Sequence, residues 1–141
     1  MNRNFARFLV VILTVICSSG GLTSSGELGL QEGQRFEIIG TLYAHGVRDD
    51  LGSSEISIIS VVPLRLSGPE IVFRKLIPVG STMTIVGKAP KKLFHFLYPD
   101  RYIVQISALD APTDVPIVID LSRGIEGKPK TLNPAIFKAL P

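Results

Sequence analysis

The chain of 141 residues has a single cysteine, Cys17, and no tryptophan. Because Cys17 lies at the end of an apolar N-terminal run, the rest of the chain has no thiol for a disulfide or a metal, so a disulfide scaffold and a cysteine-based metal site are excluded. The low aromatic share of 7% argues against an exposed surface on which bases or sugars stack. A domain of this size can still bury enough apolar surface to fold without crosslinks.

The chain also lacks a strong excess of one charge. Its 15 Lys and Arg residues exceed its 12 Asp and Glu residues by three. Two of the basic residues, Arg3 and Arg7, belong to the N-terminal segment, so the rest of the chain has 13 basic residues. Nucleic-acid-binding domains usually concentrate basic residues on one face. A nearly neutral domain has no overall field to attract a polyanion, so we do not expect a nucleic acid as the partner.

The first 21 residues have the three-part pattern of a secretory signal peptide. Arg3 and Arg7 make a short basic region, residues 8–16 are almost entirely apolar, and small residues follow. The apolar run is shorter than the ~20 residues that a membrane-spanning helix needs. We therefore predict a signal peptide at residues 1–21 and export to the periplasm or out of the cell.

Two alternatives would keep the chain on a membrane. The signal could remain uncleaved, or Cys17 could be the lipid-modified first residue of a bacterial lipoprotein, with the Ser and Gly residues behind it as a flexible tether. A lipoprotein signal has a small residue before its cysteine, whereas this chain has Ile16. This departure favours a cysteine that only completes the signal helix.

Residues 22–34 are rich in Ser, Gly and Glu, which predicts a flexible lead-in, and a single small domain is expected over residues 35–141. Apolar residues alternate with others along 35–44, and β-branched residues fill 55–66; both patterns indicate strands. The same criteria predict further strands, separated by turn residues, over 71–77, 82–87, 101–109 and 115–121.

Two short helices are also predicted. Residues 91–98 lack the alternation of a strand and precede Pro99, which would end a helix. Asn133 before Pro134 has the form of an N-cap followed by proline at the first helical position. Residues 134–140 are therefore predicted to form a C-terminal helix.

Five or six short strands with frequent turns predict a mostly β fold, specifically a small closed or half-open β-barrel. The position of a helix between the early strands and the last two resembles the element order of the OB-fold over residues 35–121. The resemblance is one of element order alone, so an SH3-like barrel and a β-sandwich stay open as alternatives.

A basic and aromatic group is the first candidate for a ligand site. Basic side chains and phenylalanines that alternate along the chain can bind phosphate by charge and bases by stacking. For an exported protein, an anionic envelope component such as a lipid head group is the more accessible ligand. Otherwise the aromatic side chains close one end of the barrel and the basic ones face water. The predicted ligand-binding residues are Lys88, Lys91, Lys92, His95 and Arg101.

A second candidate is His45, which lies close in sequence to Asp49 and Asp50. An imidazole and two carboxylates could bind a metal or exchange protons, but this spacing is not that of a specific metal site, and a charged hairpin end is the simpler interpretation. The chain has no motif of a catalytic nucleophile, a phosphate loop or a zinc site. We expect neither an enzyme nor a bound cofactor.

The leading interpretation is an exported, non-enzymatic binding module of the bacterial cell envelope, with an envelope protein or an anionic envelope ligand as its partner. One alternative is an OB-type binder of oligosaccharide or oligonucleotide. Another is a metal-binding or hydrolytic protein that uses His45, Asp49 and Asp50. Contact with a membrane is expected only through an uncleaved signal or a lipidated Cys17.

Overall fold

The computed structural model describes residues 29–90 and 100–141, so the predicted signal peptide and the predicted helix at 91–98 lie outside the described residues. None of the helices in the described ranges has the length and apolar character needed to cross a membrane. The described elements, in chain order, are β1 (Arg35–Ile38), β2 (Tyr43–Val47), β3 (Ile58–Val62), β4 (Ile71–Leu76), β5 (Thr82–Lys88), β6 (Arg101–Ile106), β7 (Ile117–Asp120), the 3-10 helix η1 (Leu121–Arg123), β8 (Gly127–Lys128), β9 (Thr131–Leu132) and β10 (Phe137–Ala139).

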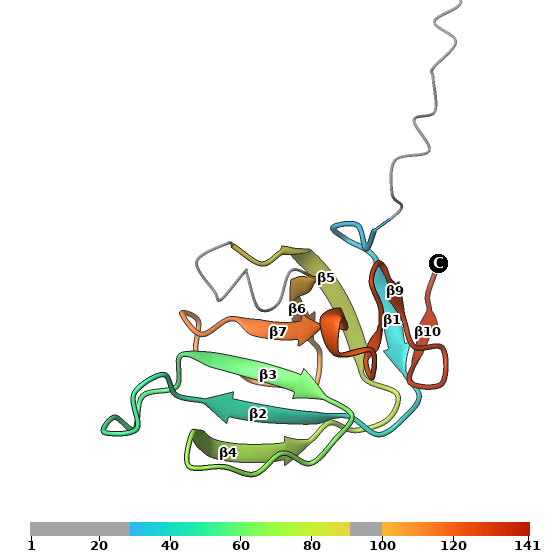
Figure 1. Cartoon of the computed structure of the whole chain (residues 1–141). Coiled ribbons are helices and arrows are strands. Elements are labelled where there is room, and N and C mark those ends of the chain that lie inside the picture. Colours follow the sequence, from blue (N-terminus) through green and yellow to red (C-terminus); the bar gives the residue numbers. More distant parts are fainter. Residues whose placement is uncertain (1–28, 91–99) are drawn as a thin grey trace, which may run out of the picture.

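Eight of these strands form one sheet in the order β10-β1-β5-β6-β7-β3-β2-β4, and β8 pairs with β9 in a separate hairpin. The pairing of β3 with β7 is parallel, and the other pairings in the sheet are antiparallel. Figure 1 shows a strongly twisted sheet, in which β2, β3, β4 and β7 run across the direction of β1 and β5. The prediction of a mostly β fold is confirmed. The strands β4 and β10 end the sheet without pairing with each other, so the described residues form no closed barrel, and an OB-like order is not confirmed.

The core lies on one face of the curved sheet and follows the alternation of apolar residues. Along β5, Met83 and Ile85 are buried, whereas the threonines beside them are partly exposed. Met83 pairs with Ile106 and Ile85 pairs with Val104, so these four side chains pack together on the core face. The period of two in this segment therefore predicts the core correctly.

The strand predicted over residues 35–44 is two strands, β1 and β2, with a break at Gly40. A Cβ atom at Gly40 would lie 2.8 Å from the carbonyl oxygen of Ala135 and 2.9 Å from the Cα of Ile136. The chain therefore passes closely against the backbone that leads into β10. The break allows β1 to pair with β5 and β10, while β2 pairs with β3 and β4.

The predicted C-terminal helix over residues 134–140 is wrong. Asn133 does cap a turn, because its Oδ1 accepts a hydrogen bond from the N–H of Ala135 at 3.0 Å and its carbonyl oxygen accepts one from the N–H of Phe137 at 2.9 Å. Only one turn follows, and the chain then continues as β10, which pairs with β1. A single helical turn is weakly stable, so burial of Phe137 and pairing with β1 outweigh the local signal.

The other predicted strands are present but shorter than expected. The strand predicted over residues 55–66 is β3, which ends before Pro63. Proline has no backbone N–H, so it cannot donate a hydrogen bond to a neighbouring strand. The strands predicted over 71–77, 101–109 and 115–121 correspond to β4, β6 and β7.

Candidate functional site

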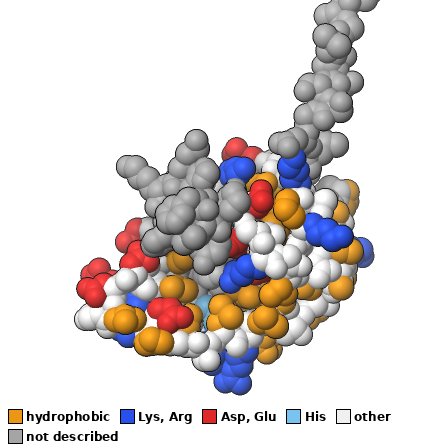
Figure 2. All heavy atoms as spheres, in the orientation of Figure 1, with side chains coloured by type: hydrophobic (Ala, Val, Ile, Leu, Met, Phe, Trp, Pro, Cys, Tyr) orange, Lys and Arg blue, Asp and Glu red, His pale blue; other side chains and the backbone are white. Residues whose placement is uncertain are grey.

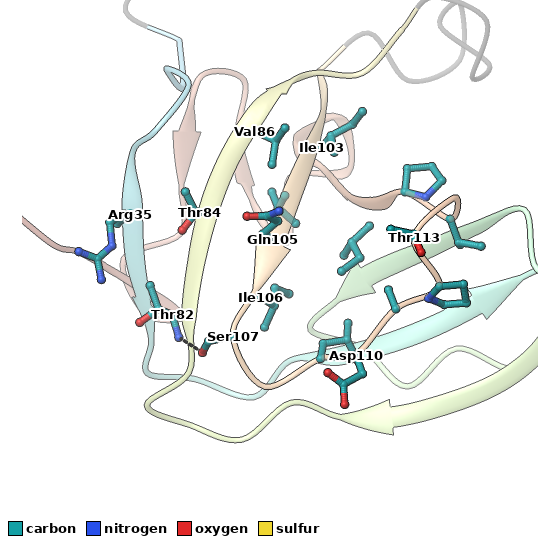
Figure 3. A pocket seen from close by; sticks show the side chains of 17 residues that line it. Arg35, Thr82, Thr84, Val86, Ile103, Gln105, Ile106, Ser107, Asp110 and Thr113 are labelled. Carbon is teal, nitrogen blue, oxygen red and sulfur yellow. Dashed lines mark hydrogen bonds between the residues drawn. The ribbon is translucent and has the colours of Figure 1, made fainter.

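A hollow of about 760 Å³ lies beside β5 and β6 and is bounded on its far side by the connector between β6 and β7. Figure 3 shows Arg35, Thr84 and Gln105 on neighbouring strands, and Asp110 and Thr113 on the connector across the hollow. Its volume falls in the range of pockets that bind small molecules or short segments. The hollow is therefore a candidate ligand site.

Three polar side chains form a row along one side of the hollow. Arg35 pairs with Thr84 between β1 and β5, and Thr84 pairs with Gln105 between β5 and β6. Residues paired in this way project from the same face of a sheet. The guanidinium group donates hydrogen bonds, whereas the hydroxyl and amide groups both donate and accept. In Figure 3 the guanidinium of Arg35 extends outward past β1, so Arg35 lies at the rim of the hollow. It can bind a carboxylate at that rim, and Thr84 and Gln105 can bind amide groups beside it.

Apolar side chains and a carboxylate complete the lining. Val86, which is 39% exposed, and Ile103 lie next to the polar row (Figure 3). The start of the connector is fixed to β5, because the Oγ of Ser107 accepts a hydrogen bond from the N–H of Thr82 at 3.0 Å. The exposed Asp110 lies near the start of the connector with its carboxylate directed outward (Figure 3), so it places a negative charge at the opposite rim of the hollow from Arg35. The lining thus offers hydrogen bonds, apolar contact and charges of both signs.

The predicted basic group does not coincide with this hollow in the described part of the chain. Lys88 is exposed at the end of β5, and Arg101 is only 8% exposed at the start of β6; neither lines the hollow. Arg101 stands opposite the buried Asp120 in the ladder between β6 and β7, a position better suited to joining strands than to binding a free ligand. The other members of the group, Lys91, Lys92 and His95, lie outside the described residues.

The His45 group is also separated. His45 is fully buried, whereas Asp49 and Asp50 are exposed in the connector that follows β2. Asp50 stabilises that connector, because its Oδ1 accepts a hydrogen bond from the N–H of Gly52 at 2.8 Å. No group of three His, Cys, Asp or Glu side chains within residues 29–90 and 100–141 could hold a metal ion, so the geometry gives the metal or hydrolytic alternative no support.

His45 instead holds the connector between β3 and β4. Both strands are antiparallel to β2 and lie on either side of it, so this connector must cross one face of β2. The N–H of Leu66 donates a hydrogen bond to Nε2 of His45 at 3.0 Å, which places the connector over the imidazole. An Nε2 that accepts a hydrogen bond is unprotonated, so the neutral ring carries its proton on Nδ1.

The surroundings of His45 keep it neutral. Burial is the main cause that lowers its pKa, the polar backbone of Ser60 opposes this shift, and the positive charges of Arg74 and Arg123 lower the pKa further. Arg74 stands opposite His45 in the ladder between β2 and β4, and its Nε donates to the carbonyl oxygen of Leu66 at 2.9 Å. A histidine and an arginine on adjacent strands therefore hold both backbone groups of one connector residue.

A buried carboxylate near the β8–β9 hairpin is a second structural polar group. Glu126 is fully buried, and its Oε1 lies 3.0 Å from Nη2 of Arg123. Burial raises the pKa of Glu126, and the charge of Arg123 lowers it in part. The carbonyl oxygen of Glu126 also accepts a hydrogen bond from the N–H of Asn133 at 2.9 Å, so this residue ties the hairpin to the segment that leads into β10.

Comparison of the chain with models of protein families, with curated proteins and with solved structures gave no match.

Proposed function

We propose that this protein is an exported, non-enzymatic binding module, and that the hollow beside β5 and β6 binds a short extended peptide segment with a carboxylate side chain. The observation that carries the proposal is the row of Arg35, Thr84 and Gln105, which lies next to the apolar Val86 and Ile103 in one hollow of about 760 Å³.

The chemistry of this row matches that of a peptide. An extended peptide presents alternating N–H and C=O groups. The hydroxyl of Thr84 and the amide of Gln105 can accept a hydrogen bond from an N–H group or donate one to a C=O group. Arg35 supplies a charge-assisted hydrogen bond to a carboxylate, and the apolar side chains contact a small aliphatic residue. This combination supports a peptide from an envelope protein as the ligand.

The same lining is less suited to the OB-type ligands. The side chains that line the hollow include no aromatic ring on which a base or sugar could stack. Arg35 is the one cation among these lining residues, whereas binding of an oligonucleotide depends on neutralising several phosphates. The described hollow therefore favours a peptide over an oligosaccharide or an oligonucleotide.

Export is proposed from the pattern of residues 1–21. Intact-mass analysis of the protein recovered from its native host is expected to give a chain that begins near Leu22. A chain that begins at a lipidated Cys17 would instead indicate a tethered protein, and a full-length chain in the cytoplasmic fraction would contradict export.

Replacement of Arg35 by glutamine is expected to remove the preference for a carboxylate. Calorimetry with acetyl-Ala-Glu-Ala-amide and its Gln counterpart measures this preference in the protein purified from its host. The unmodified protein is expected to bind the Glu peptide about fivefold more tightly, since an exposed ion pair contributes up to about 1 kcal/mol. Arg35→Gln should bind both peptides equally.

A matched control is Lys138→Gln, which removes an exposed cation on β10 whose Nζ lies 3.9 Å from Oε2 of Glu37. This variant is expected to keep the preference, because Lys138 does not line the hollow. Absence of binding of either peptide at millimolar concentration would refute the proposed ligand, as would a preference that survives Arg35→Gln.

A further inference from the structure

Exposed aliphatic side chains gather at one end of the part of the sheet formed by β2, β3 and β4. Leu64, Leu76 and Val79 are 49%, 56% and 65% exposed. Such side chains are common singly on protein surfaces, but a contiguous group marks an interaction surface.

The pairing of the strands places these residues at the same end. Tyr43 begins β2 and pairs with both Val62, the last residue of β3, and Leu76, the last residue of β4. Leu64 lies two residues beyond the end of β3, and Val79 lies three residues beyond the end of β4. Figure 2 shows hydrophobic side chains gathered over this end, to the lower right of the face in view.

Charge is divided between the two ends of these strands. The exposed Arg65 follows Leu64, and the exposed Lys75 precedes Leu76. Because β4 ends the sheet, the side chains of Lys75 and Leu76 project from the two sides of the same edge strand. The exposed acidic residues of this part of the sheet lie at the other end of these strands. They belong to the connector between β2 and β3 and are Asp49, Asp50 and Glu55. In Figure 2 the acidic side chains at the left of the molecule mark that opposite end.

We infer that the connector patch, defined as Leu64, Arg65, Lys75, Leu76 and Val79, docks on the surface of a lipid bilayer that contains anionic lipids. This inference goes beyond the proposed function, because none of these residues lines the hollow. It also adds a membrane contact to those expected from the signal segment and Cys17.

The composition of the patch favours a bilayer over a protein. Aliphatic side chains enter the boundary between head groups and acyl chains, while neighbouring Lys and Arg side chains contact anionic head groups. The patch contains no aromatic residue, whereas protein interfaces draw much of their binding energy from aromatic anchors such as Trp and Tyr. A second copy of the patch would bring Arg65 and Lys75 close to identical cations.

The inference is tested by cosedimentation of the full chain with vesicles of phosphatidylcholine alone and with vesicles that contain 30% phosphatidylglycerol. Binding is expected to be stronger to the anionic vesicles. The double variant Arg65→Ala, Lys75→Ala is expected to lose about twenty-fivefold in affinity for them, since each cation near an anionic surface contributes about fivefold. Leu76→Ser combined with Val79→Ser is expected to weaken binding to both kinds of vesicle.

Each variant has a matched control. Lys128→Ala removes an exposed cation on β8, outside the patch. Leu51→Ser changes a leucine that is 59% exposed in the connector between β2 and β3. Both controls should bind like the unmodified chain, and because every chain keeps the same N-terminal run, that run cannot account for a difference between variants. Circular dichroism verifies that each variant is folded.

Equal binding by the patch variants and their controls would overturn the inference. Concentration-dependent dimerisation that the Leu76→Ser, Val79→Ser variant abolishes, without any difference in vesicle binding, would also overturn it and would assign the patch to self-association. Failure of the vesicle test leaves the peptide measurements on Arg35 unaffected, so the two proposals can fail separately.

Discussion

Replacement of Gly127 by alanine is expected to lower the free energy of unfolding by about 3 kcal/mol. A Cβ atom at this position would lie 2.0 Å from the carbonyl oxygen of Thr131 and 3.0 Å from the Cα of Leu132. Both contacts are with backbone, so the β8–β9 hairpin must open to accommodate the methyl group. The hairpin directly follows the buried Glu126, so its opening also exposes a group that the fold keeps from water. Urea denaturation followed by circular dichroism measures the loss.

The control for this prediction is Gly87→Ala in β5. A Cβ atom there would have no neighbour within 4 Å, and the change is expected to alter the free energy of unfolding by less than about 0.5 kcal/mol. A loss below about 1 kcal/mol for Gly127→Ala would contradict the close pairing of β8 with β9.

Replacement of His45 by alanine is expected to cost about 3 kcal/mol at pH 7.5. The change leaves a cavity in a fully buried site and removes the acceptor of the Leu66 N–H. In His45→Gln the amide oxygen can accept this hydrogen bond, so the loss should be smaller. The difference between the two variants therefore separates the contribution of the hydrogen bond from that of the packed ring. Equal losses in the free energy of unfolding would contradict the role of Nε2 as acceptor.

Stability is also expected to depend on pH through His45. The pKa of His45 is lowered in the folded state. Its contribution to the free energy of unfolding is therefore complete when the pH lies above the unfolded pKa of about 6.5. Below that pH the free energy of unfolding falls by at most about 1.4 kcal/mol for each pH unit. The pKa of Glu126 is raised, so the contribution of Glu126 is complete below about 4.5 and is lost as the pH rises through its folded pKa.

The two effects have opposite signs, since that of His45 acts below about pH 6.5 and that of Glu126 acts above about pH 4.5. The contribution of His45 to the free energy of unfolding is therefore measured as the difference between the unmodified chain and a variant without the imidazole. Both the unmodified chain and His45→Gln contain Glu126, and urea denaturation of the two chains at pH 7.5, 6.5 and 5 isolates the imidazole. The advantage of the unmodified chain is expected to shrink as the pH falls below 6.5. An advantage that stays constant or grows would show that the folded state does not exclude the protonated ring.

The sequence predicted the strands better than their arrangement. The alternation along β5 identified its core face, because a period of two directly reports which side of a sheet is buried. The alternation does not predict the break at Gly40, because its cause is a close approach to the backbone of Ala135, nearly a hundred residues away in the chain. Asn133 followed by Pro134 correctly indicates a cap, but it does not predict that a strand follows, since the pairing of β10 with β1 is a long-range effect.

The candidate site could not be predicted from the sequence. Arg35, Thr84 and Gln105 lie far apart in the chain, and only the registers of β1 with β5 and of β5 with β6 bring them together. Candidate groups based on closeness in sequence were less informative. His45 and Asp50 are five residues apart, yet one is buried under a connector and the other stabilises an exposed turn.

Backbone NMR of the protein during titration with acetyl-Ala-Glu-Ala-amide shows whether the hollow beside β5 and β6 is the ligand site. We expect saturable shifts of the amide signals of Arg35, Thr84 and Gln105 and of the connector between β6 and β7, with the signals of β2 and β4 unchanged. Saturable shifts confined to β2 and β4, or no shift at millimolar peptide, would contradict this expectation.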